Sequence, residues 1–197
     1  MQKQEAEVTT TLELETPWTL WYDTEKEGHR EFGSWTNQVH KLVTINTIPA
    51  FWQVIGLAPA PSRLVSGSNY SLFRRDTPPA WESNPNGGKF ILNLPQTYTR
   101  LDSIWLDTML ALVGGEAFSG GLGVDGVVAG IRTSGKERIA LWTKNCDSKE
   151  VIAIGAEWRK ILAIPDKLTI EFFPHSSRLS ASASTPRSGP LRPQFAM

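Results

Sequence analysis

Apolar positions along the 197-residue chain follow two different periods. Alternation of apolar and polar residues, with a period of two, predicts β-strands. Such stretches lie at 17–23, 39–46, 69–74, 89–94, 126–133, 138–144 and 168–173. Apolar residues spaced three or four positions apart predict three helices, at 48–55, 101–113 and 147–161. Strands joined by hairpins and interleaved with helices favour an α+β domain, with one mainly antiparallel sheet and helices on one face.

The two ends of the chain lack this patterning. Residues 1–15 are mostly polar, so we expect a flexible segment, in which Leu12 and Leu14 can form a short adhesive stretch. Residues 174–197 are rich in serine, proline and arginine, a composition typical of disorder. The sequence therefore predicts one folded domain over 16–173.

Charge and cysteine content narrow the class of protein. Lys plus Arg and Asp plus Glu both total 20, so no basic field draws the protein onto long nucleic acid, and any RNA contact should be local. A single cysteine, Cys146, and a polar N-terminus without a long apolar run favour cytosolic or nuclear residence and no membrane span. The three histidines show no metal-ligand spacing with one another or with Cys146. We expect a monomer without a metal or a cofactor.

The eight tryptophans fall into different settings. Those in apolar periodic segments are expected in the core: Trp18, Trp21, Trp105, Trp142 and Trp158. Trp35 and Trp81 instead lie in polar loops rich in glycine or proline, each after a predicted strand. Either one alone can fold back as a lid over the core, but together they can form an aromatic clamp for a flat ring, above all a cationic one.

Charged residues near these loops suggest which ligand groups would bind beside such a clamp. Glu82 offers only acceptors, which match the adjacent N1–H and N2–H donors of guanine, although a solvated loop carboxylate is the simpler interpretation. Arg132, Lys136 and Arg138 lie within seven positions around a predicted hairpin turn and can meet phosphates, although they also suit an ordinary charged hairpin.

Taken together, these residues resemble the mRNA cap-binding translation initiation factor 4E family. The resemblance runs in order through PWTLW at 17–21, Trp35, AFW at 50–52, NYSLF at 69–73, AWE at 80–82, GGKFILNL at 87–94, SIWLDTMLALVGG at 103–115, GVVAGIR at 126–132 and IALWTKN at 139–145. Each match is short, but nine in order with similar spacing are specific, and they cover roughly residues 12–173.

The resemblance implies a single curved sheet with three helices on its convex face and a site for the 7-methylguanosine cap on its concave face. It assigns the cap site to Trp35, Trp81, Glu82, Arg132, Lys136, Arg138 and Trp142. By this interpretation Trp35 and Trp81 sandwich the methylated base, Glu82 holds the guanine edge, and the basic residues hold the phosphates. Trp142 then lies near the methyl group rather than wholly in the core.

Four features depart from the family pattern. The segment between Trp21 and Trp35 is long, the phosphate hairpin is one residue longer, Asn69 stands where an acidic residue is usual, and the stretch 115–126 is rich in glycine. These departures indicate a divergent paralogue, of the kind expected in kinetoplastid protozoa.

A second surface is predicted on the helices. The helix at 101–113 carries two apolar stripes, more than one buried face needs, and Ile48 and Trp52 lie four apart on theirs. Both stripes can simply be buried. The resemblance instead implies a convex patch that binds a helix of a partner, either a scaffold factor like initiation factor 4G or a 4E-binding repressor. It nominates Ile48, Trp52, Leu106 and Leu110, joined by Leu12 and Leu14.

Two rival functions remain. The stretch 121–126 matches G-x-G-x-x-G, but it follows a predicted helix and opens a strand, the reverse of a dinucleotide site. We therefore expect no enzyme. An aromatic cage for methylated cations fits the tryptophans and Glu82 but not the basic hairpin. The sequence predicts a cap-binding factor in translation initiation, with a translational repressor paralogue as the alternative role.

Overall fold

The computed structural model describes residues 12–24, 39–95, 97–115, 117–120, 123–132, 137–176 and 193–197. They form one eight-stranded sheet in which all neighbouring strands are antiparallel, in the order β2-β1-β3-β5-β6-β4-β7-β8. The strands are β1 (Glu13–Thr24), β2 (His40–Thr47), β3 (Ser68–Arg74), β4 (Gly88–Leu94), β5 (Val124–Gly130), β6 (Glu137–Thr143), β7 (Ile170–Pro174) and β8 (Phe195–Ala196).

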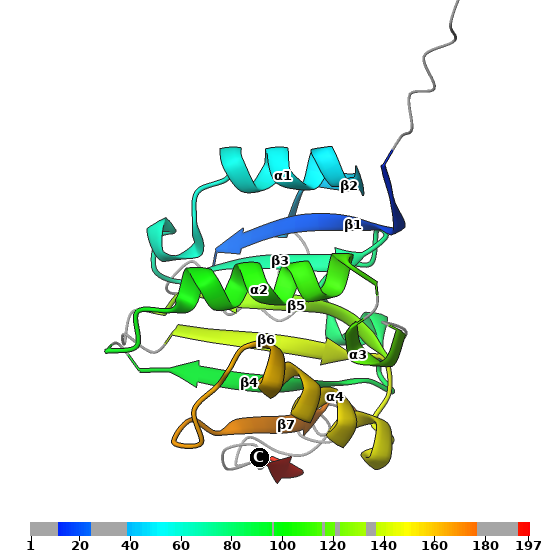
Figure 1. The fold of residues 1–197 in the computed structure, drawn as a ribbon, viewed down its shortest axis with the longest axis vertical. Coiled ribbons are helices and arrows are strands. Elements are labelled where there is room, and N and C mark those ends of the chain that lie inside the picture. Colours follow the sequence, from blue (N-terminus) through cyan, green and yellow to red (C-terminus); the bar gives the residue numbers. More distant parts are fainter. Residues whose placement is uncertain are drawn as a thin grey trace, which may run out of the picture.

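Helices cover one face of this sheet, as Figure 1 shows. The long ones are α1 (Ile48–Leu57), α2 (Leu101–Val113) and α4 (Ser148–Ile161), and α3 (Ala117–Gly120) is a single turn beside α4. The predicted fold class, a curved antiparallel sheet with three helices on its convex face, is confirmed. The opposite, concave face carries no α-helix among the described residues. No described helix is both long enough and apolar enough to cross a bilayer.

Local sequence explains where the helices begin. The Thr47 hydroxyl accepts a hydrogen bond from the Ala50 amide at 3.2 Å, and Pro49 occupies the first turn, where its missing N–H costs nothing. At the start of α4, Asp147 Oδ1 accepts from the amides of Lys149 and Glu150. Both helices thus start within one residue of the predicted positions.

The main core lies between the sheet and the helices. Alternation along β1 places Trp18 and Leu20 in this layer, at 1% and 4% exposure. Trp158 of α4 is fully buried, and its indole N–H donates to the Thr108 hydroxyl of α2 at 3.0 Å. The polar atom of this large side chain is therefore satisfied inside the core.

Part of each chain end that was predicted to be flexible forms a β-strand in the structure. Strand β1 begins at Glu13, inside the segment expected to be flexible, and pairs there with Thr47. Near the other end, Phe195 and Ala196 form β8 on the edge of β7, and Phe195 stacks on Phe172 with ring centroids 5.1 Å apart. Two residues have no period to read, so the sequence pattern gave no sign of this strand.

Strand order has a consequence for the concave face. Strands β3 and β4 follow one another in the chain but are not neighbours in the sheet, because β5 and β6 lie between them. The segment 75–87 must therefore span both central strands. This segment carries Trp81, and its path brings that side chain to the concave face.

Candidate functional site

A small second cluster of apolar side chains lies on the concave face. Its buried members are Phe73, Ala140 and Trp142, and the rings of Phe73 and Trp142, 1% and 7% exposed, meet edge to face with centroids 5.3 Å apart. Trp21 and Trp81 pack against them. Trp21 was predicted in the main core, and this is wrong, because alternation along β1 turns it away from Trp18 and Leu20. The indole N–H groups of Trp21 and Trp142 are buried and have no acceptor among the described residues, which is rare in folded proteins.

Above this cluster is a cavity of about 290 Å³, here called the concave cavity. Five of the predicted cap-site residues line it together: Trp81, Glu82, Arg132, Arg138 and Trp142. Trp35 and Lys136 lie outside the described residues, so the opposite wall of the predicted clamp stays a prediction. The residues that can be placed thus combine an aromatic face, an exposed carboxylate and two guanidinium groups around one space.

Polar contacts fix the segment that carries Trp81. Trp81–Ser83 is one turn of 3₁₀ helix, followed directly by Asn84. The Asn84 side-chain amide donates to Asp125 Oδ2 at 2.7 Å and to the carbonyls of Lys144 and Thr143 at 3.0 and 3.2 Å. The loop is thereby tied to β5 and to the end of β6, so these polar contacts add to the packing of Trp81 on the apolar cluster in fixing its position.

The far end of the same segment is also tied to its surroundings. The buried His175 ring contacts the Asn84 carbonyl through Nδ1 at 2.8 Å, and its backbone N–H donates to the Gly87 carbonyl at 2.9 Å. The Cys146 thiol donates to that same carbonyl at 2.9 Å. A side chain at Gly87 would collide with the Thr143 carbonyl oxygen, so only glycine allows this close approach.

Burial shifts the pKa of two groups that contact the segment from Asn84 to Gly87. Desolvation raises the pKa of the Asp125 carboxyl, and the Asn84 hydrogen bond opposes that shift. Desolvation likewise raises the pKa of the Cys146 thiol, opposed by its hydrogen-bonded contact with the His175 backbone. The thiol therefore stays protonated at neutral pH, in keeping with its role as a donor.

The two arginines stand at the base of one hairpin. Arg132 follows β5 and Arg138 lies on β6 directly opposite Gly130. Arg132 Nη1 donates to the carbonyls of Ile131 and Ser68 at 2.9 and 3.4 Å, and Nη2 donates to Asn69 Oδ1 at 2.8 Å. The Arg132 guanidinium is thus held in one orientation at the rim of the concave cavity.

Sequence reasoning missed several lining residues. Lys89 of β4 lies opposite Trp142 in register, with its Nζ 5.4 Å from the centre of that ring. Asp23, Asn69 and Ser71 line the cavity from β1 and β3. Alternation was the available signal, because Asp23 is two residues from Trp21 and Ser71 is two from Phe73.

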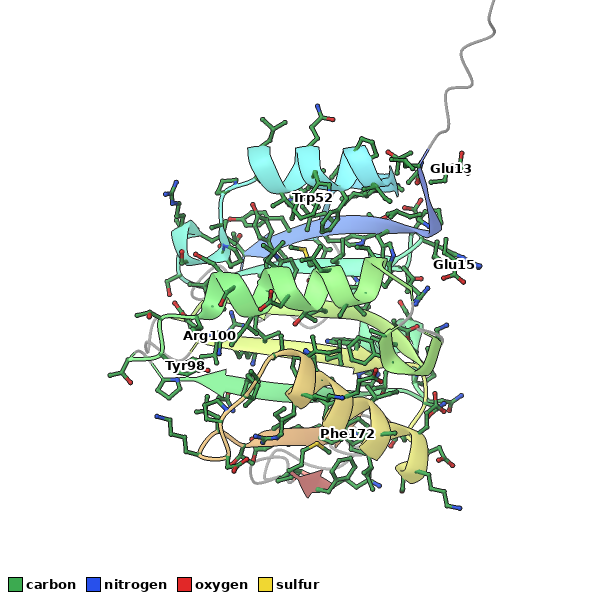
Figure 2. All side chains as sticks on the ribbon, viewed as in Figure 1. Glu13, Glu15, Trp52, Tyr98, Arg100 and Phe172 are labelled. Carbon is green, nitrogen blue, oxygen red and sulfur yellow. The ribbon has the colours of Figure 1, made fainter. Side chains whose placement is uncertain are left out.

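The convex face holds a different cavity, of about 310 Å³ and here called the helix-side cavity. Of the predicted partner residues it is lined by Leu14, Ile48, Trp52 and Leu110. Trp52 is 51% exposed, and Figure 2 shows it on α1, on the side of the molecule where β1 begins with Glu13 and Glu15. Both glutamates also line this cavity, which is otherwise apolar.

The other two predicted partner residues, Leu106 and Leu12, do not line the helix-side cavity. Leu106 is partly buried and lines a separate apolar cavity of about 170 Å³ between α1 and α2. Leu12 is exposed, and its carbonyl accepts from the Ile48 amide at 2.8 Å, which joins the start of β1 to the start of α1.

These features place a cavity lined by aromatic and charged side chains on one face of the sheet and a mainly apolar cavity on the other. A model of the eukaryotic initiation factor 4E family matches residues 13–188. The eukaryotic translation initiation factor 4E of Candida glabrata is 36% identical over 166 residues, covering 83% of this chain and 78% of that protein. Since the match spans most of the sequence, the chain belongs to the eukaryotic initiation factor 4E family.

Solved structures agree with this fold. The complex of Ascaris suum eIF4E-3 with an m2,2,7G cap has a TM-score of 0.80 at 24% identity, covering 95% of this chain and 98% of that chain. The complex of C. elegans eIF4E-3 with the 4E-binding protein Mextli and a cap analog has a TM-score of 0.79 at 24% identity, covering 95% and 100%. At this identity the similarity shows the fold alone. The predicted kinetoplastid origin stays a prediction.

Proposed function

We propose that this protein binds the 7-methylguanosine cap of mRNA in the concave cavity and acts in translation initiation in the cytosol. The observation that carries this proposal is the meeting of Trp81, Glu82, Arg132 and Arg138 around one cavity of about 290 Å³. Membership of the initiation factor 4E family supports it, as do the caps bound in the complexes of the nematode relatives.

Each group has a distinct part in this proposal. Trp81 stacks on the methylated base, a contact that contributes about 1–3 kcal/mol, and the positive charge of 7-methylguanine adds a cation–π attraction. Glu82 accepts from N1–H and N2–H of guanine in a charge-assisted pair, which an adenine edge does not match. Arg132 and Arg138 bind the phosphates, Lys89 adds a third positive charge at the cavity, and Trp35 closes the other side of the base.

We further propose that the helix-side cavity binds an amphipathic helix of a scaffold protein or of a 4E-binding repressor. Trp52 and Ile48 are 51% and 41% exposed, which is unusual for large apolar side chains unless they meet a partner. Helix-in-groove binding uses apolar anchors three or four positions apart, which fits a groove between α1 and α2. The C. elegans relative forms a complex with such a binding protein, Mextli.

A fluorescence titration tests the cap site. Stacking on Trp81 should quench tryptophan emission, and 7-methyl-GTP should bind at least tenfold more tightly than GTP, because only the methylated base carries a positive charge. Glu82→Gln should weaken 7-methyl-GTP binding by about tenfold, the cost of losing one charge-assisted hydrogen bond. Equal affinity for GTP and 7-methyl-GTP would contradict the proposal.

A second ligand set separates this function from a cage for methylated cations. A trimethyl-lysine peptide carries a similar cation but no phosphate, so a cage binds it and a cap site does not. Binding of that peptide in preference to 7-methyl-GTP would assign the cavity to the cage.

A further inference from the structure

Side chains of β1, of β3 and of Arg132, which follows β5, form a chain of hydrogen bonds at the rim of the concave cavity. Asp23 of β1 lies directly opposite Asn69 of β3, and Asn69 lies directly opposite Gly130 of β5, two residues before Arg132. The Asn69 Nδ2 donates to Asp23 Oδ1 at 2.5 Å, and the Asn69 Oδ1 accepts from Arg132 Nη2 at 2.8 Å. All three side chains line the cavity.

The chemistry of the two ends fixes the amide between them. An ionised carboxylate only accepts hydrogen bonds and a guanidinium only donates them. Asn69 therefore satisfies both neighbours in one orientation alone, with its nitrogen towards Asp23 and its oxygen towards Arg132. Asp23 is 5% exposed, and a buried carboxylate strongly favours such a donor.

Arg132 is held on two sides by this arrangement. The carbonyls of Ile131 and Ser68 accept from Nη1, and Asn69 accepts from Nη2. These contacts do not use all the N–H groups of a guanidinium, so donors remain for a phosphate oxygen.

We propose that Asp23 and Asn69 are a positioning pair, which orients Arg132 and thereby sets how much the phosphates of a capped nucleotide add to its affinity. This rests on the proposed cap-binding function. The pair touches the phosphates only through Arg132, so the recognition of the base by Trp81 and Glu82 does not depend on it.

Titrations with a phosphate series test the pair. The ligands are 7-methylguanosine and its mono-, di- and triphosphates, measured with the full chain. Asp23→Asn removes the acceptor-only neighbour and lets the Asn69 amide turn over. We expect it to weaken triphosphate binding by about tenfold and to leave the affinity for the nucleoside unchanged within twofold.

A swapped pair serves as the matched control. Asn69→Asp alone sets two carboxylates against each other and should weaken triphosphate binding at least as much as Asp23→Asn. In the double variant D23N/N69D, the new amide at position 23 donates to the new carboxylate at position 69, which still accepts from Arg132. We expect the double variant to bind the triphosphate within about threefold of the parent, which is a coupling that independent structural damage cannot produce.

Two results would overturn the positioning pair. One is an equal loss of nucleoside and triphosphate affinity in Asp23→Asn, and the other is a double variant as weak as Asn69→Asp, provided that the melting temperatures show folded protein. In either case the parent protein still binds 7-methyl-GTP and the cap function stands. If the parent binds none of the four ligands, the proposed function fails, and the pair with it.

Discussion

The concave and convex faces of the sheet each present a tryptophan, but the two side chains are supported differently. Trp81 projects from a loop that is held by hydrogen bonds donated by the Asn84 side chain and by the contacts of His175 and Cys146. Trp52 projects from α1, whose own backbone hydrogen bonds hold it, and stands half exposed over an apolar cavity. A loop residue can be as well positioned as a helix residue, but it needs dedicated polar contacts.

The two cavities also differ in the charged side chains that line them. The concave cavity combines Arg132, Arg138 and Lys89 with the carboxylates of Asp23 and Glu82, and such a site suits a ligand with both a ring and phosphates. The helix-side cavity is apolar except for Glu13 and Glu15. The proposed sites for the nucleotide and for the protein partner thus lie on opposite sides of one sheet.

The largest effects are expected when Trp81 or Trp52 is replaced by alanine. The two substitutions should separate nucleotide binding from peptide binding. Trp81→Ala should weaken 7-methyl-GTP binding by about 5- to 150-fold, the equivalent of one stacking contact, and leave binding of a 4E-binding helical peptide unchanged. Trp52→Ala should do the reverse, with a loss of about 30-fold for the peptide, as for a hot-spot tryptophan. Isothermal titration calorimetry measures both ligands on both variants, and circular dichroism checks the fold. Loss of both activities in either variant would contradict the separation.

Removing the Asn84 side chain, which holds the Trp81 loop, should have a smaller effect and should weaken nucleotide binding but not peptide binding. Asn84→Ala deletes the donor to Asp125 and to the carbonyls of Thr143 and Lys144, so we expect a loss of about 1–3 kcal/mol in unfolding free energy. The affinity for 7-methyl-GTP should fall several-fold because Trp81 is no longer held, whereas peptide binding should stay the same. The exposed Asn46→Ala on β2 is the matched control. A variant that loses stability but keeps full nucleotide affinity would show that the anchor does not position Trp81.

The smallest effect is expected at Asp125. Because burial raises its pKa, the folded protein holds this proton more tightly than the unfolded chain, so the carboxyl lowers stability as pH rises from about 4 through the folded pKa. Asp125→Asn keeps an oxygen for Asn84 and removes the partly buried charge. We expect a melting temperature about 1–2 °C above the parent at pH 7 and no difference at pH 3.5, by scanning calorimetry. A variant less stable than the parent at pH 7 would contradict this sign.

Local pattern predicted the elements well where a period could be read. The helix at 101–113 and the strand at 89–94 agree with α2 and β4 to within one residue, because their apolar spacing is long and regular. The face on which Trp21 lies was missed, although alternation from Trp18 determines it. The pairing of Phe195 and Ala196 with β7 was beyond reach, since nothing local marks so short a strand.

At the candidate site, too, some residues could be predicted from the local sequence and others could not. Trp81, Glu82, Arg132, Arg138 and Trp142 were recognisable by residue type and by resemblance. The residues that hold them were not, because their roles arise between strands far apart in sequence. Asn84 reaches Asp125 across 41 positions, and Asp23 reaches Asn69 across 46. Only the strand order brings such pairs together, and the sequence pattern did not specify that order.

The strand order also decides how binding is transmitted through the molecule. Strands β2, β1 and β3 form one ribbon and β4, β7 and β8 another, and within the described sheet the β5–β6 hairpin is what joins them. Arg132 and Arg138 belong to this hairpin, and the Trp81 segment links β3 to β4 across it. A ligand held by these groups fastens the two ribbons together, so its binding energy opposes opening of the whole sheet rather than of one loop. Its signature is slower amide hydrogen exchange as far away as β2 and β7, strands that contribute no side chain to the concave cavity.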